Sequence, residues 1–514
     1  MGQPVEGTMD GNRNTSVQMA GLIGGPLIAI LFLAFFDMDP ARPMVGRTAA
    51  VAFVMAVWWV TEAAPLAATS LLPVFLFPAL GIMNGKDVAT QYFNHVIFLF
   101  LGGFLVAAAM ERWNLHRRIA LNILIVLGKS LGGILLGFML ATGFLSMWMS
   151  NTACAMIMMP IMMAVIVKLE EMFGKDRLGS FSKGLLLSVA YSASIGGVAT
   201  IVGTPPNAAF VKIFSIQFPN APEITFAQFL ALGFPISASF LFFGWLYLMI
   251  AFKPAGKFQF DRQEFRSQLA GLGPVKYEEK VVMALFLALV FLWIFREPID
   301  TGLFRIPGWG AVFPNPKYLT DGASAIFVAC LLFAIPSKTI PGQRIMEWDS
   351  VLKLPWDIVL LFGGGFALAQ GFEDSGLSMW VGERLKGVGS MSPVALVALI
   401  CTISTFLTEF TSNTATAQIL LPIFASLAVA AKVNPLLTMI PATFGVSFAF
   451  MLPVATPPNA IVFGSGRLRI WDMAKAGLVM NLIGIAVVVI ASLTLLPLIW
   501  GVELHTFPDW AGKK

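Results

Sequence analysis

Long uncharged apolar runs occupy most of this sequence. Runs long enough for a single helix lie at 17–36, 95–110, 184–214, 227–252, 281–295, 321–336, 356–372, 436–465 and 473–500. A helix that crosses the hydrocarbon core of a bilayer needs about 20 mainly apolar residues. Only 12% of all residues are charged, whereas soluble domains carry about 25%. We therefore predict an all-α polytopic membrane protein.

Three further apolar stretches are interrupted or too long for one helix. The stretch 49–83 contains Glu62 and Pro65 and is expected to form two helices, which brings the predicted spans to eleven. The stretches 130–167 and 393–430 each suit a helix pair with a polar cluster at its centre. If these pairs are re-entrant, the clusters lie near the midplane, where non-helical backbone requires a protein-lined or wet cavity.

The basic residues predict the orientation. With the N-terminus inside, 21 of the 33 Lys and Arg residues fall in cytoplasmic segments, as the positive-inside rule requires. The C-terminus is then external. Compact loops and the lack of a transit peptide favour a bacterial inner (plasma) membrane. The net charge of +5 is explained by this topology and does not indicate nucleic acid.

The second half of the chain repeats the first. The motif Ser-Asn-Thr-Ala at 150–153 returns at 412–415, and Thr-Pro-Pro-Asn-Ala at 204–208 returns at 456–460. Gly-Gly-Phe at 102–104 likewise returns at 364–366. Five predicted spans separate the two helix pairs, so the repeats enter the membrane from opposite faces. Inverted repeats with discontinuous helices are typical of secondary transporters, whose sites lie at the repeat interface.

The paired prolines predict where two helices are broken. Pro205 and Pro206 cannot donate hydrogen bonds to the carbonyls of residues 201 and 202. Pro457 and Pro458 have the same effect on residues 453 and 454. Each helix is therefore expected to unwind at its centre and to free carbonyl oxygens.

Hydroxyl, amide and freed carbonyl oxygens are the ligands that a small hard cation such as sodium prefers. Ser146 and Ser150 are four residues apart, which places them on one face of a helix, and Thr408 and Ser412 repeat this spacing. Two oxygen cages follow when Asn151 or Asn413 and the backbone near Gly203 or Ala455 are added. Ser and Thr in membrane helices also bond to their own backbone, but duplication beside an Asn and a broken helix favours the cages.

The same clusters suit an anion. Ser, Thr and Asn at a helix start leave backbone N–H groups pointing outward, where the helix dipole attracts a carboxylate. Two facing clusters would hold two anionic ends, with bound cations supplying the compensating charge. Proton coupling would need intramembrane acids. Glu62 and Glu409 are the notable ones, and a structural role is expected for both.

The sequence favours neither an enzyme nor a resident metal centre. Cys154, Cys330 and Cys401 lack zinc-type spacing, the three histidines are scattered, and no His-Glu-x-x-His motif is present. An ion channel is a distant alternative, because inverted repeats with paired breaks favour a carrier.

The paired clusters and breaks resemble those of the divalent anion/sodium symporter (DASS) family. The resemblance implies a homodimer with eleven transmembrane helices, two re-entrant hairpins and an elevator movement in each protomer. By matching motif, the first sodium site would use Ser146, Ser150, Asn151 and the Gly203 carbonyl, and the second Thr408, Ser412, Asn413 and the Ala455 carbonyl. Substrate would contact Ser150, Asn151, Thr152 and Thr204 in the first half and Ser412, Asn413, Thr414 and Thr456 in the second.

The charged segment 253–280 and the resemblance together divide the chain. Residues 17–128 and 281–392 would form scaffold helices, 129–252 and 393–500 the transport parts, 253–280 a cytoplasmic connector and 501–514 an external tail. Residues 1–16 would form a flexible arm, in which the chain departs from the family. The expected function is sodium-coupled import of a C4-dicarboxylate such as succinate, malate or fumarate. A dicarboxylate exchanger of the same fold, or a citrate or sulfate carrier, are the alternatives.

Overall fold

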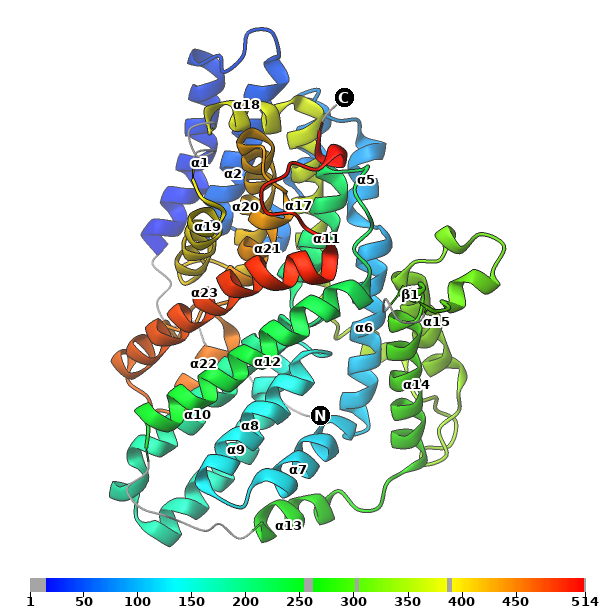
Figure 1. Ribbon diagram of the computed structural model, residues 1–514, viewed down its shortest axis with the longest axis vertical. Helices are drawn as coiled ribbons and strands as arrows, with labels where there is room; N and C mark the ends of the chain where they lie inside the picture. The colour runs from blue at the N-terminus through cyan, green and yellow to red at the C-terminus, as the bar shows by residue number, and fades with distance from the viewer. Residues whose placement is uncertain (1–14, 254–261, 301–304, 386–390, 513–514) are drawn as a thin grey trace.

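The computed structural model describes residues 15–253, 262–300, 305–385 and 391–512. The predicted arm 1–16 lies almost wholly outside the described residues. Nearly all described elements are helices (Figure 1). The first half contains α1 (Thr15–Phe35), α2 (Pro43–Thr61), α3 (Leu66–Thr69), α4 (Leu72–Ala79), α5 (Gly85–Tyr92), α6 (His95–Arg112), α7 (Leu115–Leu127), α8 (Leu131–Ser146), α9 (Asn151–Phe173), α10 (Lys175–Gly197), α11 (Pro205–Gln217) and α12 (Phe226–Ala251).

The second half follows a similar order. Its helices are α13 (Gln263–Gly271), α14 (Tyr277–Ile294), α15 (Asp321–Ala334), α16 (Trp348–Val351), α17 (Trp356–Ser375), α18 (Leu377–Arg384), α19 (Pro393–Thr408), α20 (Asn413–Ala431), α21 (Leu436–Gly445), α22 (Pro457–Phe463) and α23 (Ile470–Trp500). Between α14 and α15 a two-stranded antiparallel hairpin, β1 (Ile299–Asp300) and β2 (Arg305–Ile306), precedes short 3₁₀ turns. An all-α polytopic fold is thus confirmed apart from this small hairpin.

Seven helices in the described part of the chain are long and apolar enough to cross a membrane. They comprise α1, α2, α5 with α6, α9, α12, α20 and α23. Shorter apolar helices include α8, α15, α19 and α21. The two stretches predicted as helix pairs are pairs, α8 with α9 and α19 with α20, and each turns at its polar cluster.

The stretch 49–83 differs from the prediction in its second helix. After α2 the chain does not form one further helix but the short α3 and α4. Prolines explain the division, since Pro65 precedes α3, Pro73 occupies the first turn of α4 and Pro78 lies within it.

Both predicted helix breaks are present. The run 184–214 is divided into α10 and α11, and the run 436–465 into α21 and α22. In each case two prolines occupy the first two positions of the second helix, where their missing N–H groups are not required. The break between α10 and α11 covers 198–204, whereas that between α21 and α22 covers the longer segment 446–456.

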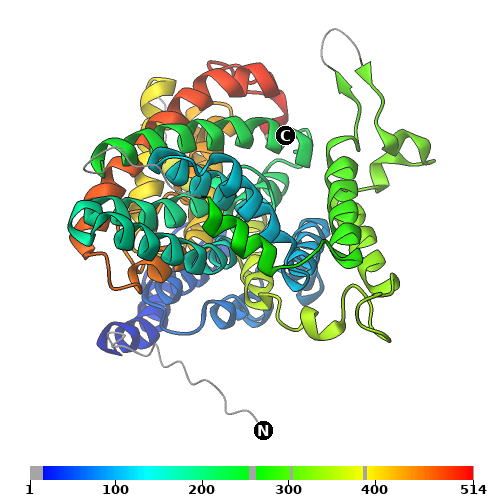
Figure 2. The same cartoon turned by 90° about the horizontal axis from the view of Figure 1, so that it is seen from below.

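Two groups of helices can be distinguished in Figures 1 and 2. An oblique group contains α8, α9, α10, α12 and α23, whereas α14 and α15 stand beside α6 on the opposite side. Ion pairs between distant parts of the sequence join the oblique group. Lys183 of α10 pairs with Asp472 of α23 at 2.8 Å, and Arg467 pairs with Glu170 of α9. The two halves of the chain are therefore interleaved.

Candidate functional site

The first polar cluster lies at the tip of the α8–α9 hairpin. Helix α8 ends at Ser146, and Ser150 is the N-cap of α9, where its Oγ accepts a hydrogen bond from the backbone N–H of Ala153. The prediction that Ser146 and Ser150 share one helical face is therefore wrong. The chain must reverse at the tip, so the spacing of four residues spans a turn between two helices.

Three oxygen atoms converge beside this tip. Ser146 Oγ lies 2.7 Å from both Asn151 Oδ1 and the carbonyl oxygen of Ala193 in α10. A serine hydroxyl has one proton and donates to one of these acceptors at a time. The cluster thus has more lone pairs than protons, an arrangement that favours a bound cation.

The first helix break reaches the same cluster. A Cβ atom built on Gly197 would lie 2.5 Å from Asn151 Oδ1 and 3.0 Å from the carbonyl oxygen of Gly203. The structure therefore brings together Ser146, Asn151 and Gly203, three of the four residues predicted for the first sodium site. Thr200, which the sequence reading missed, donates to the Met147 carbonyl and links the break to the hairpin tip.

The second half repeats the oxygen cluster. Thr408 Oγ1 lies 2.7 Å from Asn413 Oδ1 and 2.8 Å from the carbonyl oxygen of Val446. Helix α19 ends at Thr408 and Ser412 is the N-cap of α20, so these two residues do not share a helical face either. The pairing of Thr408 with Asn413 matches that of Ser146 with Asn151.

Glu409 holds the longer second break. Its buried carboxylate accepts hydrogen bonds from the backbone N–H groups of Phe450, Met451 and Leu452 and from Asn481 Nδ2, at 2.7–3.3 Å. Unwinding removes the helical acceptors of these N–H groups, and the carboxylate replaces them. This geometry agrees with the predicted structural role of Glu409.

The remaining predicted residues lie at helix starts. Thr152 is half-buried in the first turn of α9 and Thr414 is buried in the first turn of α20. Thr204 and Thr456 are the buried N-caps of α11 and α22, and the Thr456 hydroxyl has no hydrogen-bond partner. Ala455 lies in a turn where its amide donates to the Leu452 carbonyl. No hydrogen bond in the described residues joins Ala455 to the Asn413 side chain.

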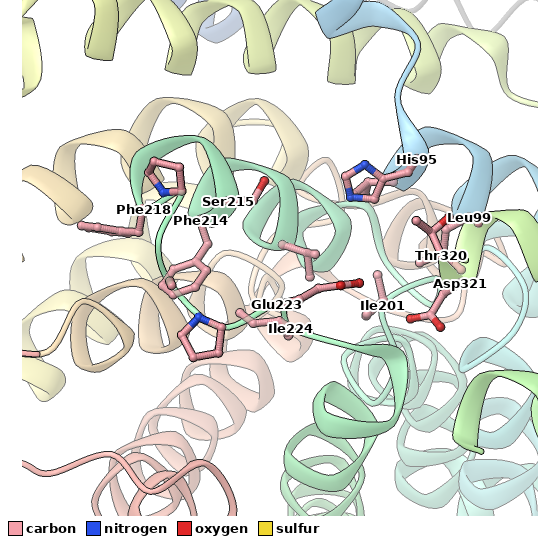
Figure 3. A pocket seen from close by; sticks show the side chains of 16 residues that line it. His95, Leu99, Ile201, Phe214, Ser215, Phe218, Glu223, Ile224, Thr320 and Asp321 are labelled. Carbon is pink, nitrogen blue, oxygen red and sulfur yellow. The ribbon is translucent and has the colours of Figure 1, made fainter. Parts of the chain in front are cut away.

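A separate cavity of about 280 Å³ lies between the starts of α6 and α15 and the segment that follows α11. Figure 3 shows His95, Thr320 and Asp321 at one end and Phe214 and Phe218 at the other. None of the predicted site residues lines it.

Buried charges lie beside this cavity. Arg296, which follows α14, pairs with Asp321 at 2.7 Å and with Glu223 at 2.9 Å. Asp321 also accepts from the backbone N–H of Phe226 at the start of α12. Burial alone would lower the pKa of the Arg296 guanidinium, but the carboxylates around it raise that pKa above its ordinary value. These contacts join α14 and α15 to the loop between α11 and α12.

The chain resembles known transporters over nearly its whole length. It is 46% identical over 496 residues to the sodium-dependent dicarboxylate transporter SdcS of Staphylococcus saprophyticus. The aligned region covers 95% of this chain and 93% of that protein. It is 43% identical over 495 residues to the protein of the same name from Staphylococcus aureus, with the same coverage.

Two solved structures share the fold at low sequence identity. MtrF of Neisseria gonorrhoeae, described as illuminating a class of antimetabolite efflux pumps, has a TM-score of 0.58 at 13% identity, with 95% of each chain covered. The YdaH transporter of Alcanivorax borkumensis has a TM-score of 0.54 at 14% identity, with 87% of this chain and 98% of that chain covered.

A family model places the chain among these transporters. The model for the sodium:sulfate symporter transmembrane region matches residues 29–501, which include both hairpins and both breaks. With the paired oxygen clusters, this match establishes that the chain belongs to the divalent anion/sodium symporter family.

Proposed function

We propose that this protein imports C4-dicarboxylates such as succinate, malate and fumarate together with sodium ions. The observation that carries the proposal is the duplicated oxygen cluster, in which a hydroxyl, an Asn side chain and a backbone carbonyl meet beside a broken helix. The names of the staphylococcal relatives support both the cation and the class of anion.

Sodium binds at the two clusters in this proposal. The first ion is held by Ser146, Ser150, Asn151 and the Gly203 carbonyl, and the second by Thr408, Ser412, Asn413 and the Ala455 carbonyl. Neutral oxygen ligands suit a monovalent cation. Several carbonyl and hydroxyl dipoles can replace the water around an ion that carries a single charge.

The dicarboxylate binds between the two hairpin tips. Helices α9 and α20 begin at the tips, so their free N–H groups and dipoles favour one carboxylate each. The proposed contacts come from Ser150, Asn151, Thr152 and Thr204 and from Ser412, Asn413, Thr414 and Thr456. None of these is basic, so the sodium ions supply the positive charge that makes anion binding depend on them.

The moving part in this proposal contains residues 129–252 and 393–500, and the scaffold contains 17–128 and 281–392. The ion pairs of Lys183 with Asp472 and of Arg467 with Glu170 support a moving part that spans both repeats, since each joins one repeat to the other. We further propose a homodimer in the bacterial inner membrane with a cytoplasmic N-terminus and an external C-terminus.

The test is uptake of labelled succinate into proteoliposomes with and without an inward sodium gradient. We expect saturable, sodium-dependent accumulation, and its loss in Asn151→Ala and in Asn413→Ala. Asn122→Ala is the matched control, because Asn122 is exposed on α7 and bonds locally to the Arg118 carbonyl.

Uptake that needs internal dicarboxylate and no sodium would identify an exchanger instead. Normal uptake in either site variant would contradict the site.

A further inference from the structure

We propose that Asn207 and Asn459, the last polar residues of the two Thr-Pro-Pro-Asn motifs, are positioning residues for the two ion sites. Each would hold the unwound segment that presents a backbone carbonyl to sodium. This inference rests on the proposed sodium coupling and adds two residues that act on the ions only through the backbone.

Asn207 bridges the first helix break. Its Nδ2 donates to the carbonyl oxygen of Gly197 at 3.2 Å and to that of Thr200 at 2.7 Å. Gly197 is the last residue of α10, and Asn207 is the third residue of α11. One side chain therefore ties the helix before the break to the break itself and to the helix after it.

Asn459 makes the corresponding bridge in the second half, although both of its acceptors lie within the longer break and not in α21. Its Nδ2 donates to the carbonyl oxygens of Ala449 and Leu452, both at 2.9 Å. A shift of 252 residues converts each donor and each acceptor of the first bridge into those of the second. The acceptor side chains differ between the halves, so only the Asn and the backbone path are common to both bridges.

The motif explains why an asparagine is needed at this position. A break frees carbonyl oxygens inside the protein, and buried carbonyls need donors. The two prolines that follow the break have no N–H to offer. Asparagine is the first residue after them, and its amide group carries two donors. Both donors are used in each half, and both side chains are fully buried.

The orientation of each amide is fixed by its surroundings. Asn207 Oδ1 and Asn459 Oδ1 are buried without a hydrogen-bond partner. Rotating either amide by half a turn would place this oxygen against two carbonyl oxygens, which repel it. The donors therefore have to face the break, and the geometry of the break depends on them.

The bridge acts on the first ion site through Gly197. The Gly197 carbonyl receives one of the two hydrogen bonds of Asn207, and a Cβ built on Gly197 would lie 2.5 Å from Asn151 Oδ1 and 3.0 Å from the Gly203 carbonyl oxygen. Loss of the bridge would let this segment relax and move the Gly203 carbonyl relative to Asn151. The site would then bind sodium more weakly although each of its own ligands is still present.

The experiment measures how succinate uptake depends on sodium in proteoliposomes. The variants are Asn207→Ala, Asn207→Ser, Asn207→Asp and the same three at Asn459. We expect the sodium concentration for half-maximal uptake to rise about tenfold in the Ala variants, equivalent to about 1.4 kcal/mol. The Ser variants keep one donor and should shift less. The Asp variants preserve size but point a carboxylate at two carbonyls, and should shift at least as much as Ala.

Two control variants remove a buried side-chain bond to a backbone carbonyl outside the breaks. Ser237→Ala removes the bond to Ile195 in α10, and Thr438→Val removes the bond to Phe424 in α20. These controls should lower thermal stability as the Asn variants do but leave half-saturating sodium within about twofold. At saturating sodium, the KM for succinate should stay near the wild-type value in every variant that folds.

The outcomes separate this inference from the proposed function. Uptake by the wild-type protein that does not depend on sodium would overturn the proposed function. Sodium-dependent wild-type uptake, with Asn variants that shift no more than Ser237→Ala, would overturn the positioning role alone. Near-normal sodium dependence in the Asp variants would also overturn it, because the side chains would then only fill space.

Discussion

Gly197 has room for a hydrogen atom and for no side chain. A methyl group at this position would lie 2.5 Å from Asn151 Oδ1 and 3.0 Å from the Gly203 carbonyl oxygen. Gly197→Ala is therefore expected to lower sodium-dependent uptake at least about tenfold, because Asn151 must leave the oxygen cluster. Uptake and thermal stability should be measured together, so that loss of function is not mistaken for loss of fold.

The matched control lies on the same helix. Gly179→Ala also adds a methyl group to α10, but apart from the backbone of α10 itself no atom lies within 4 Å of the new Cβ. This variant should transport at the wild-type rate and be at least as stable, since alanine favours helix more than glycine does. Equal loss of uptake in both variants would mean that α10 tolerates no substitution and that the contact with Asn151 has no special role.

The sequence predicted site residues where a motif is repeated. It did not predict contacts between residues that are far apart along the chain. The repeat identified Asn151 and Asn413, and the structure places each beside its hydroxyl partner. It did not reveal what Glu409 binds, since its partners lie 41 or more residues further along the chain. The spacing of Ser146 and Ser150 wrongly predicted a shared helical face, because no proline or glycine marks the end of α8 at Ser146.

The helix breaks are set by proline chemistry, so the sequence predicted their positions. Their lengths were not predictable. The second break extends from 446 to 456 because a carboxylate supplied by another helix satisfies the N–H groups there. The sequence did not predict the subdivision into α3 and α4. A proline is tolerated in the first turn of a helix but disrupts its interior, so its effect depends on where the helix begins.

Removing the prolines should close the first break. In Pro205→Ala/Pro206→Ala the two restored N–H groups can bond to the carbonyls of residues 201 and 202 and extend α11 backwards. Sodium-dependent uptake is then expected to fall at least about tenfold in proteoliposomes. Pro160→Ala is the control, because Pro160 lies inside α9 and not at a break. Unchanged uptake in the double variant would show that the prolines do not maintain the site.

The assembly of the whole molecule depends on contacts that no local pattern encodes. The repeat predicted two related halves that enter the membrane from opposite faces, but not the ion pairs that bring residues about 290 positions apart together. Such contacts follow from packing of the finished helices. The cluster around Arg296 is of the same kind, because its partners come from the loop before α12 and from the first residue of α15.

The charges around Arg296 should have unequal effects on stability. Arg296→Ala leaves the buried Asp321 without its cation and should cost about 3–5 kcal/mol. Glu223→Gln removes a partner whose side chain is 55% exposed and should cost less than about 1 kcal/mol. Thermal unfolding in detergent would rank the variants. A Glu223 variant as unstable as the Arg296 variant would mean that the exposed pair, and not the buried one, holds these helices together.

We expect the unequal lengths of the two breaks to give the two proposed ion sites different kinetics. The first break is short and buried, so its oxygens are already in place, whereas the second is longer and exposes Val454 to 87%. Any adjustment of the second break on ion binding involves more non-helical residues than in the first break, and therefore a greater cost in entropy. We expect sodium to fill the first site before the second. After rapid mixing with sodium and succinate, the change in fluorescence of Trp148 at the first tip should come before succinate binding. A carrier made of two related halves would then load its two sodium ions in a fixed order, although the motifs of the halves are the same.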